Sequence, residues 1–332
     1  MLDLVPLWAG ILALAVFMYV LLDGFDLGVG MLFMMRDTDH DRHLMMSSIA
    51  PVWDFNETWL VLGAGGLLAV FPLAFAIIVP AVYFPVVLML LGLMFRGVAF
   101  EYREVVGSRK PIWDRAFCYG SLTATFFQGV VLGMFIHGFK VSGREFVGTS
   151  WDWVSPFPLL TGLGLIAGYL LQGSTWLVMK TEGELQQWAR KMAKRSVFGV
   201  IVFVLVISIG TPLADARIAE RWFSFPDSIA FAPVPVLSVL LFWWLWSGLQ
   251  KNREVLPFAC SIGVFFLAFS GLVISLWPFI APPSVSLRDA AAAPISQQFL
   301  LLGTLFLLPV LLLYVVWSYW VFRGKVKHDM GY

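Results

Sequence analysis

The chain has 332 residues, of which 60% are hydrophobic and 13% are charged, and its formal net charge at pH 7 is +1. This composition excludes an ordinary soluble domain, and the near-zero charge argues against a nucleic-acid partner. The 15 tryptophans and 30 phenylalanines are typical of a protein that crosses a membrane several times and has aromatic residues at both interfaces.

The apolar stretches are long enough for membrane helices, because a hydrocarbon core roughly 30 Å thick needs about 20 residues. One uncharged stretch runs from Trp59 to Phe95, and as a single helix it would be about 55 Å long. Pro72 is therefore expected to end one helix and begin the next. We predict an all-α polytopic protein with nine transmembrane helices, near residues 4–35, 54–71, 73–96, 116–138, 157–179, 196–214, 233–250, 256–280 and 297–322.

The basic residues predict how these spans are oriented. With nine spans, 17 of the 22 lysines and arginines fall on one side of the membrane, whereas eight spans would divide them 15 to 7. Cytoplasmic loops carry the excess of lysine and arginine. The C-terminus is therefore expected in the cytoplasm and the N-terminus in the periplasm.

A short internal similarity suggests that the transmembrane domain, residues 1–332, contains a repeat. The sequence LLDGFD at residues 21–26 resembles LLQGST at residues 170–175. Both segments would run from outside to inside, which is compatible with a parallel repeat. The expected arrangement has one four-helix unit at 4–138, a second at 157–250 plus 256–280, and a peripheral ninth helix at 297–322. Six similar positions are also compatible with chance.

Charged residues within the first three spans are the main functional signal. An ionised carboxylate at the bilayer centre costs about 2.5–3.5 kcal/mol on insertion scales, so such residues usually face a partner or a water-filled path. All of them lie toward the cytoplasmic side, which predicts a proton entry path. The candidate residues are Asp23, Asp26, Trp53, Asp54, Glu57, Arg96 and Glu101.

Structural roles are the alternative for the same residues. Asp54 and Glu57 also fit the start of a helix, with Asp54 as the capping residue and Glu57 as the acid of a capping box. Gly24, Gly28 and Gly30 favour close helix packing over ligand binding.

The sequence predicts no metal or redox centre in this chain. His137 is the one histidine near a span, and it lies at the outer end without an obvious second haem ligand. The cysteines, Cys118 and Cys260, lie in apolar runs and are expected to be buried thiols. No Cys-x-x-Cys pair, zinc spacing or phosphate-binding loop is present.

Several motifs resemble subunit II of the cytochrome bd-type quinol oxidases, and together they span nearly the whole chain. They are DGFDLGVG at 23–30, SIAPVWD at 48–54, FRGVAFEYR at 95–103, PPSVS at 282–286, DAAA at 289–292 and SYWVFRGKV at 318–326. The motif NETW at 56–59 resembles the sequence of the cyanide-insensitive branch of the family more closely.

The resemblance implies a subunit of a terminal oxidase that oxidises quinol and reduces dioxygen to water in a bacterial cytoplasmic membrane. It implies a partner, subunit I, that has the same fold and carries the b haems and haem d, whereas subunit II binds no haem. It also implies that Trp53 and Asp54 belong to a cytoplasmic proton path. This chain has Phe55 where the family usually has glycine, which weakens the assignment to Asp54. A bound quinone or lipid and a small accessory subunit are left open.

Two other interpretations fit the same acids. An ion-coupled secondary transporter would also place acids in helices, but its sites concentrate at the membrane midplane, whereas these acids lie toward one side. Composition does not distinguish a proton-conducting subunit from a purely structural membrane subunit without a proton role.

Overall fold

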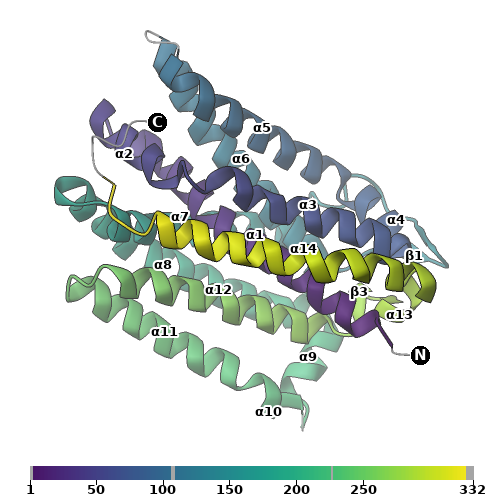
Figure 1. Cartoon of the computed structure of the whole chain (residues 1–332). Helices are drawn as coiled ribbons and strands as arrows, with labels where there is room; N and C mark the ends of the chain where they lie inside the picture. The colour runs from purple at the N-terminus through teal and green to yellow at the C-terminus, as the bar shows by residue number, and fades with distance from the viewer. Residues whose placement is uncertain (1–2, 106–108, 226, 327–332) are drawn as a thin grey trace.

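The computed structural model describes residues 3–105, 109–225 and 227–326, and this part of the chain is almost entirely helical (Figure 1). The long helices are α1 (Val5–Leu32), α3 (Trp53–Val70), α5 (Tyr83–Val105), α6 (Lys110–His137), α7 (Pro156–Lys180), α8 (Gly183–Ala214), α11 (Pro233–Gln250), α12 (Val255–Leu276) and α14 (Pro294–Val321). They lie along a common direction, and the chain starts at one end of the bundle and finishes at the other (Figure 1).

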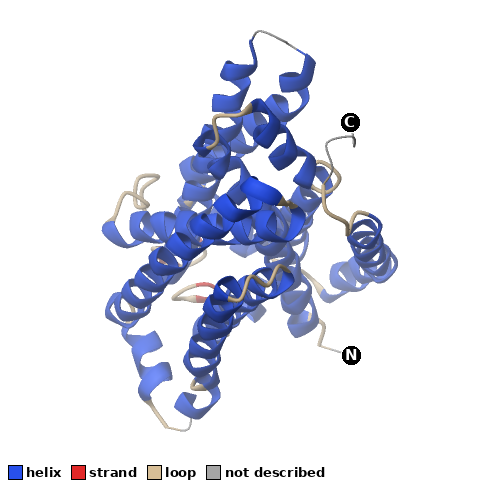
Figure 2. Ribbon diagram, turned by 90° about the vertical axis from the view of Figure 1, so that its left-hand side faces the viewer, coloured by secondary structure: helices blue, strands red, loops and turns tan. Residues whose placement is uncertain are grey.

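The shorter elements lie between the long helices. They are η1 (Phe33–Met35), α2 (Asp39–Ile49), α4 (Pro72–Ala81), α9 (Ala216–Phe223), α10 (Asp227–Phe231), α13 (Leu287–Ala290), β1 (Val141–Ser142), β2 (Glu145–Phe146), β3 (Phe279–Ala281) and β4 (Val285–Ser286). The strands form two antiparallel hairpins, β1–β2 and β3–β4. Figure 2 shows that helices make up most of the molecule.

Eight of the described helices are long and apolar enough to cross a membrane, namely α1, α5, α6, α7, α8, α11, α12 and α14. The prediction of an all-α, multi-pass protein is therefore confirmed. The α3 helix has 18 residues but is not among the eight. Its first turns carry Asp54, Asn56 and Glu57, which lower its hydropathy.

The helix expected at 73–96 is wrong in its boundaries. The chain breaks before Pro72, as predicted, but the helix that begins there ends at Ala81, and α5 begins only at Tyr83. Pro85 fits the first turn of α5, where a missing N–H costs no helical hydrogen bond. At ten residues, α4 is too short to cross a membrane. Its apolar side chains pack instead with residues of the α6 end, β3 and α13 at one end of the bundle.

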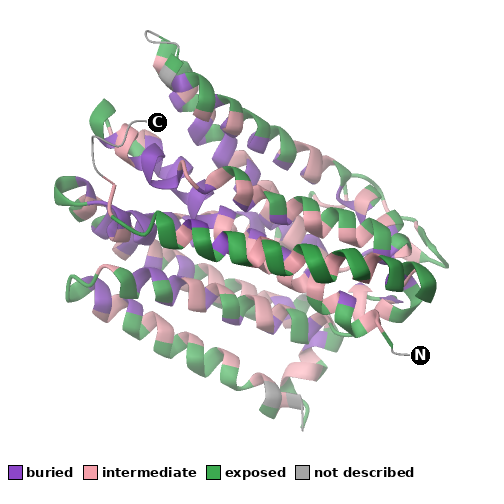
Figure 3. Ribbon diagram, viewed as in Figure 1, coloured by how far each residue is buried: buried purple, intermediate pink, exposed green. Residues whose placement is uncertain are grey.

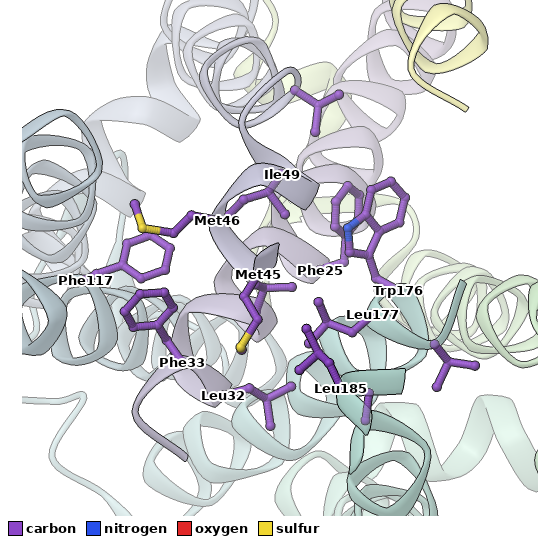
Figure 4. Close-up of a cluster of buried hydrophobic side chains, with 14 of the residues drawn as sticks. Phe25, Leu32, Phe33, Met45, Met46, Ile49, Phe117, Trp176, Leu177 and Leu185 are labelled. Carbon is purple, nitrogen blue, oxygen red and sulfur yellow. The ribbon is translucent and has the colours of Figure 1, made fainter. Parts of the chain in front are cut away.

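The C-terminal half of α1 is the centre of the molecule. Every residue from Asp23 to Phe33 is buried, whereas most of α14 is exposed (Figure 3). Phe25 of α1 stacks on Trp176 of α7, with ring centroids 4.1 Å apart. Both rings belong to a cluster of buried apolar side chains that joins α1, α2, α6, α7 and α8 (Figure 4).

Helices α1 and α7 touch backbone to backbone at Gly28. A Cβ added at Gly28 would clash with the Tyr169 carbonyl oxygen and lie 2.8 Å from the Gly173 nitrogen. Gly24 is similarly close, since a Cβ there would lie 2.6 Å from the Tyr169 ring and clash with the Gln172 side chain. The interpretation of these glycines as helix-packing residues is therefore confirmed.

The segment after α14 folds back over the end of α7. The buried Lys180 ammonium donates hydrogen bonds to the carbonyl oxygens of Phe322 and Gly324, the latter at 3.1 Å. The Val326 amide donates to the Lys180 carbonyl at 2.9 Å. Lys325 forms an ion pair with Glu254 at 2.7 Å. We refer to residues 322–326 as the C-terminal segment.

Candidate functional site

A buried ion cluster joins helices α1, α3 and α5. The side chain of Arg96, on α5, is only 1% exposed. One of its terminal nitrogens donates to Asp23 Oδ1 of α1 at 2.6 Å, and the other donates to Glu57 of α3. The Trp53 ring lies beside the guanidinium, 5.9 Å from its carbon to the ring centroid. Glu57 is 28% exposed at its side chain, so the cluster leads from the surface of the bundle to its centre.

Asp26 extends this cluster toward α14. Asn56 Nδ2 donates to Asp26 Oδ2 at 2.6 Å and to the Leu22 carbonyl at 3.1 Å. The Tyr319 hydroxyl of α14 donates in turn to Asn56 Oδ1 at 3.2 Å. Asp26 has no ion pair with a basic side chain among those in the described chain, so a neutral amide is its donor.

The cluster holds more acid than base. Asp23, Asp26 and Glu57 supply three carboxyl groups, and Arg96 supplies one guanidinium. Full ionisation would place net negative charge inside a membrane protein, and such charge needs bound counter-ions or protons. No group of three or more His, Cys, Asp or Glu side chains in the described residues is placed to hold a metal ion. Because one guanidinium cannot neutralise three carboxylates, protonation of an acid would lower the buried negative charge.

Two of the sequence candidates lie outside the buried cluster. Asp54 is exposed on the first turn of α3, one helical turn before Glu57, and Glu101 is exposed near the end of α5. The capping alternative for Asp54 is wrong, because the N-cap of α3 is Val52 and no side chain caps the helix. Phe55 packs edge-on against Tyr314 and Tyr319 of α14, so its bulk fills the contact between α3 and α14.

Several buried or partly buried polar residues of the site are not among the sequence candidates. Asn56 lies in the NETW motif, but its place between Asp26 and Tyr319 is visible only in the structure. The others are Tyr19, Gln128, Tyr169, Gln172 and Tyr319. The one sequence signal for any of these residues is the similarity between LLDGFD at 21–26 and LLQGST at 170–175, in which Gln172 corresponds to Asp23.

A second ion cluster fixes α2 to the ends of α5 and α6. Asp114 accepts from Arg103 at 2.6 Å and from Arg42 at 2.8 Å. Asp39 pairs with Arg103 and, at 3.2 Å, with Lys110. Partial burial acts to raise the pKa of Asp39, but hydrogen bonds from Arg103 and Lys110 outweigh it and lower that pKa below its usual value. Each acid here has a basic partner, which favours a structural role.

His137 lies far along α6 from the buried cluster. It is exposed and lines a cavity of about 440 Å³ beside the β1–β2 hairpin, together with Lys140, Asp152 and Ser155. Both expected thiols, Cys118 and Cys260, are buried and free.

Comparison with known proteins gives consistent matches over the whole chain. Residues 4–322 match the family model described as cytochrome bd terminal oxidase subunit II. The chain is 30% identical over 338 residues to cytochrome bd ubiquinol oxidase subunit 2 of Bacillus subtilis (strain 168), covering 99% of this chain and 98% of that protein. It is 27% identical over 351 residues to cytochrome bd-I ubiquinol oxidase subunit 2 of Escherichia coli (strain K12), covering 94% and 92%.

The fold is also found in a solved structure. A chain of the bd oxidase from Geobacillus thermodenitrificans superposes with a TM-score of 0.78, covering 97% of this chain and 100% of that one. The sequence identity is 18%, so this match concerns the fold.

Proposed function

The chain belongs to the cytochrome bd terminal oxidase subunit II family, and from this premise we propose that it carries protons from the cytoplasm toward the oxygen-reducing site of its complex. It is a subunit of a quinol oxidase complex, whose other main subunit is subunit I. Family membership implies that the haems lie in subunit I. The proposed role of this chain is therefore proton transfer and support of subunit I, with no electron transfer through it.

We infer that α3 is a ninth span. Its 18 residues correspond to about 27 Å of helix, close to the thickness of the hydrocarbon core. An odd number of crossings agrees with a described chain that starts and finishes at opposite ends of the bundle (Figure 1).

The proposed orientation places the C-terminus in the cytoplasm of a bacterial cell and the N-terminus in the periplasm. It follows from the excess of basic residues at the end of the bundle where α5 ends and α6 begins. Lys327, one of the basic residues assigned to this side, lies outside the described residues.

The continuous contact from the surface to the centre of the bundle supports the proposed path. In this orientation, Asp54 lies at the cytoplasmic end of α3, and Glu57 lies one turn deeper. Arg96 bridges Glu57, which is partly exposed, to Asp23, which is fully buried. This bridge is the observation on which the proposal depends, because it holds a partly exposed acid and a fully buried acid on one guanidinium. Water beside these acids would carry the proton between them, while the guanidinium stays charged.

The test compares carboxylate variants in the assembled complex. Asp54→Asn and Asp23→Asn should leave the haem spectrum unchanged and slow quinol-driven oxygen consumption, by about tenfold or more for Asp23→Asn. Asp152→Asn is the matched control, because this acid pairs with Lys140 at the other end of the bundle. Unchanged turnover in Asp54→Asn would remove Asp54 from the path, and unchanged turnover in both would favour a purely structural subunit.

A further inference from the structure

Gln172 is a fully buried amide without a hydrogen-bond partner in the described part of the chain. It lies on α7, and neither its side-chain oxygen nor its nitrogen is satisfied. A Cβ added at Gly24 would clash with Gln172 Oε1, so the amide lies against the α1 backbone at Gly24, the residue that follows Asp23. A buried amide normally has a partner, in the protein or in ordered water.

Other buried polar atoms without a hydrogen-bond partner in the described residues belong to Asp23 and to side chains that interact with it. They include the second oxygen of Asp23, Oδ2, together with Nε of Arg96 and the hydroxyl of Tyr19. Tyr19 and Tyr169 both interact electrostatically with Asp23. These groups offer both donors and acceptors, and a buried water usually makes two to four hydrogen bonds to such groups.

Tyr169 adds a hydroxyl that can donate. Its oxygen accepts from Gln128 Nε2 at 2.9 Å, which leaves its own hydrogen for another acceptor. The Tyr169 ring is fully buried and stacks on Phe265, with centroids 5.7 Å apart. The buried and stacked ring therefore fixes the position of the Tyr169 hydroxyl.

We propose that Gln172 and Tyr169 hold ordered water against the second carboxylate oxygen of Asp23, with Gln172 as a positioning residue. Arg96 occupies Oδ1 of Asp23, and Tyr19 lies within reach of the same carboxyl group, so the open side of Oδ2 is the position that can exchange a proton with water. A proton that reaches Asp23 binds to Oδ2 and then passes to this water, which leaves Asp23 ionised again, while Arg96 keeps its charge. This inference rests on the proposed proton path, but the position of the water can be tested separately.

The experiment uses the purified complex and infrared difference spectroscopy in H₂O and D₂O. The bands of Asp23 are identified by their loss in Asp23→Asn. Gln172→Leu and Tyr169→Phe should both shift these bands, and the loss of one hydrogen bond should slow turnover by roughly five- to tenfold. Thr175→Val is the control, because Thr175 is equally buried on the same helix and its hydroxyl bonds to the Leu171 carbonyl at 2.8 Å.

The spectra distinguish the water site from the proton path. Asp23 bands that are unchanged in Gln172→Leu and Tyr169→Phe overturn the water site, whatever the turnover. Shifted bands together with normal turnover in Asp23→Asn support the water site and overturn the path. If Gln172→Leu does not assemble, as judged by the haem spectrum, Tyr169→Phe decides, because it keeps the ring.

Discussion

Replacing Arg96 by glutamine should destabilise the protein more than a change to either carboxylate that it contacts. Arg96 is 1% exposed at its side chain and serves both Asp23 and Glu57. Removing one partner of a buried ion pair typically costs about 3–5 kcal/mol, because the remaining charge stays buried without compensation. Asp23→Asn keeps an acceptor for Arg96, which also retains Glu57, so its expected cost is about 1–3 kcal/mol.

The control is a triple variant in which Arg96, Asp23 and Glu57 are all replaced by uncharged residues. Arg96→Gln combined with Asp23→Asn and Glu57→Gln should recover most of the lost stability, because replacing all partners of a buried pair is often close to neutral. Unfolding of the purified complex by increasing SDS in mild detergent, followed by tryptophan fluorescence, measures the difference. A single Arg96→Gln variant as stable as the wild type, or a triple variant less stable than the single, would refute the reasoning.

Three further predictions concern packing, pH and haem content. Gly28→Ala should force α1 and α7 apart, cost at least about 1–3 kcal/mol and reduce the yield of complex, whereas Gly10→Ala should be tolerated, because no atom lies within 4 Å of the added Cβ. The hydrogen bond from Lys325 lowers the pKa of Glu254. The ion pair between Lys325 and Glu254 therefore stabilises the C-terminal segment fully above the pKa of Glu254 in the unfolded chain, about 4.3. This stabilisation is lost as the pH falls through the lower pKa of Glu254 in the folded protein. Hydrogen-exchange protection of the Val326 amide, corrected for intrinsic rates, should report this loss, and Glu254→Gln should abolish the pH dependence. The chain purified without subunit I should show no haem absorbance, and a stoichiometric b-type spectrum would contradict a haem-free subunit.

Much of the fold was predictable because the membrane imposes span length and composition. The end of α4 at Ala81 has a local cause, because Pro85 cannot donate a hydrogen bond to the Ala81 carbonyl in a continuous helix. Pro80 lies inside α4, however, so the prolines alone do not mark where the helix ends. The acids were recognisable as unusual in apolar helices, but the rotation of α3 about its axis decides which of them is buried. Asn56 faces inward and Asp54 faces outward, because residues two positions apart lie on nearly opposite faces of a helix. Periodicity in an almost uniformly apolar helix does not reveal that rotation.

The C-terminal segment makes the hydrogen bonding of buried Lys180 depend on a part of the chain that is synthesised much later. Chains are made from the N-terminus onward, and Phe322 follows Lys180 by 142 residues, so the C-terminal segment leaves the ribosome long after α7. Until then, the ammonium lacks the carbonyl oxygens of Phe322 and Gly324. A chain truncated before α14 ends would keep this cation without its acceptors, so the contacts of Lys180 distinguish chains that contain the C-terminal segment from chains that lack it.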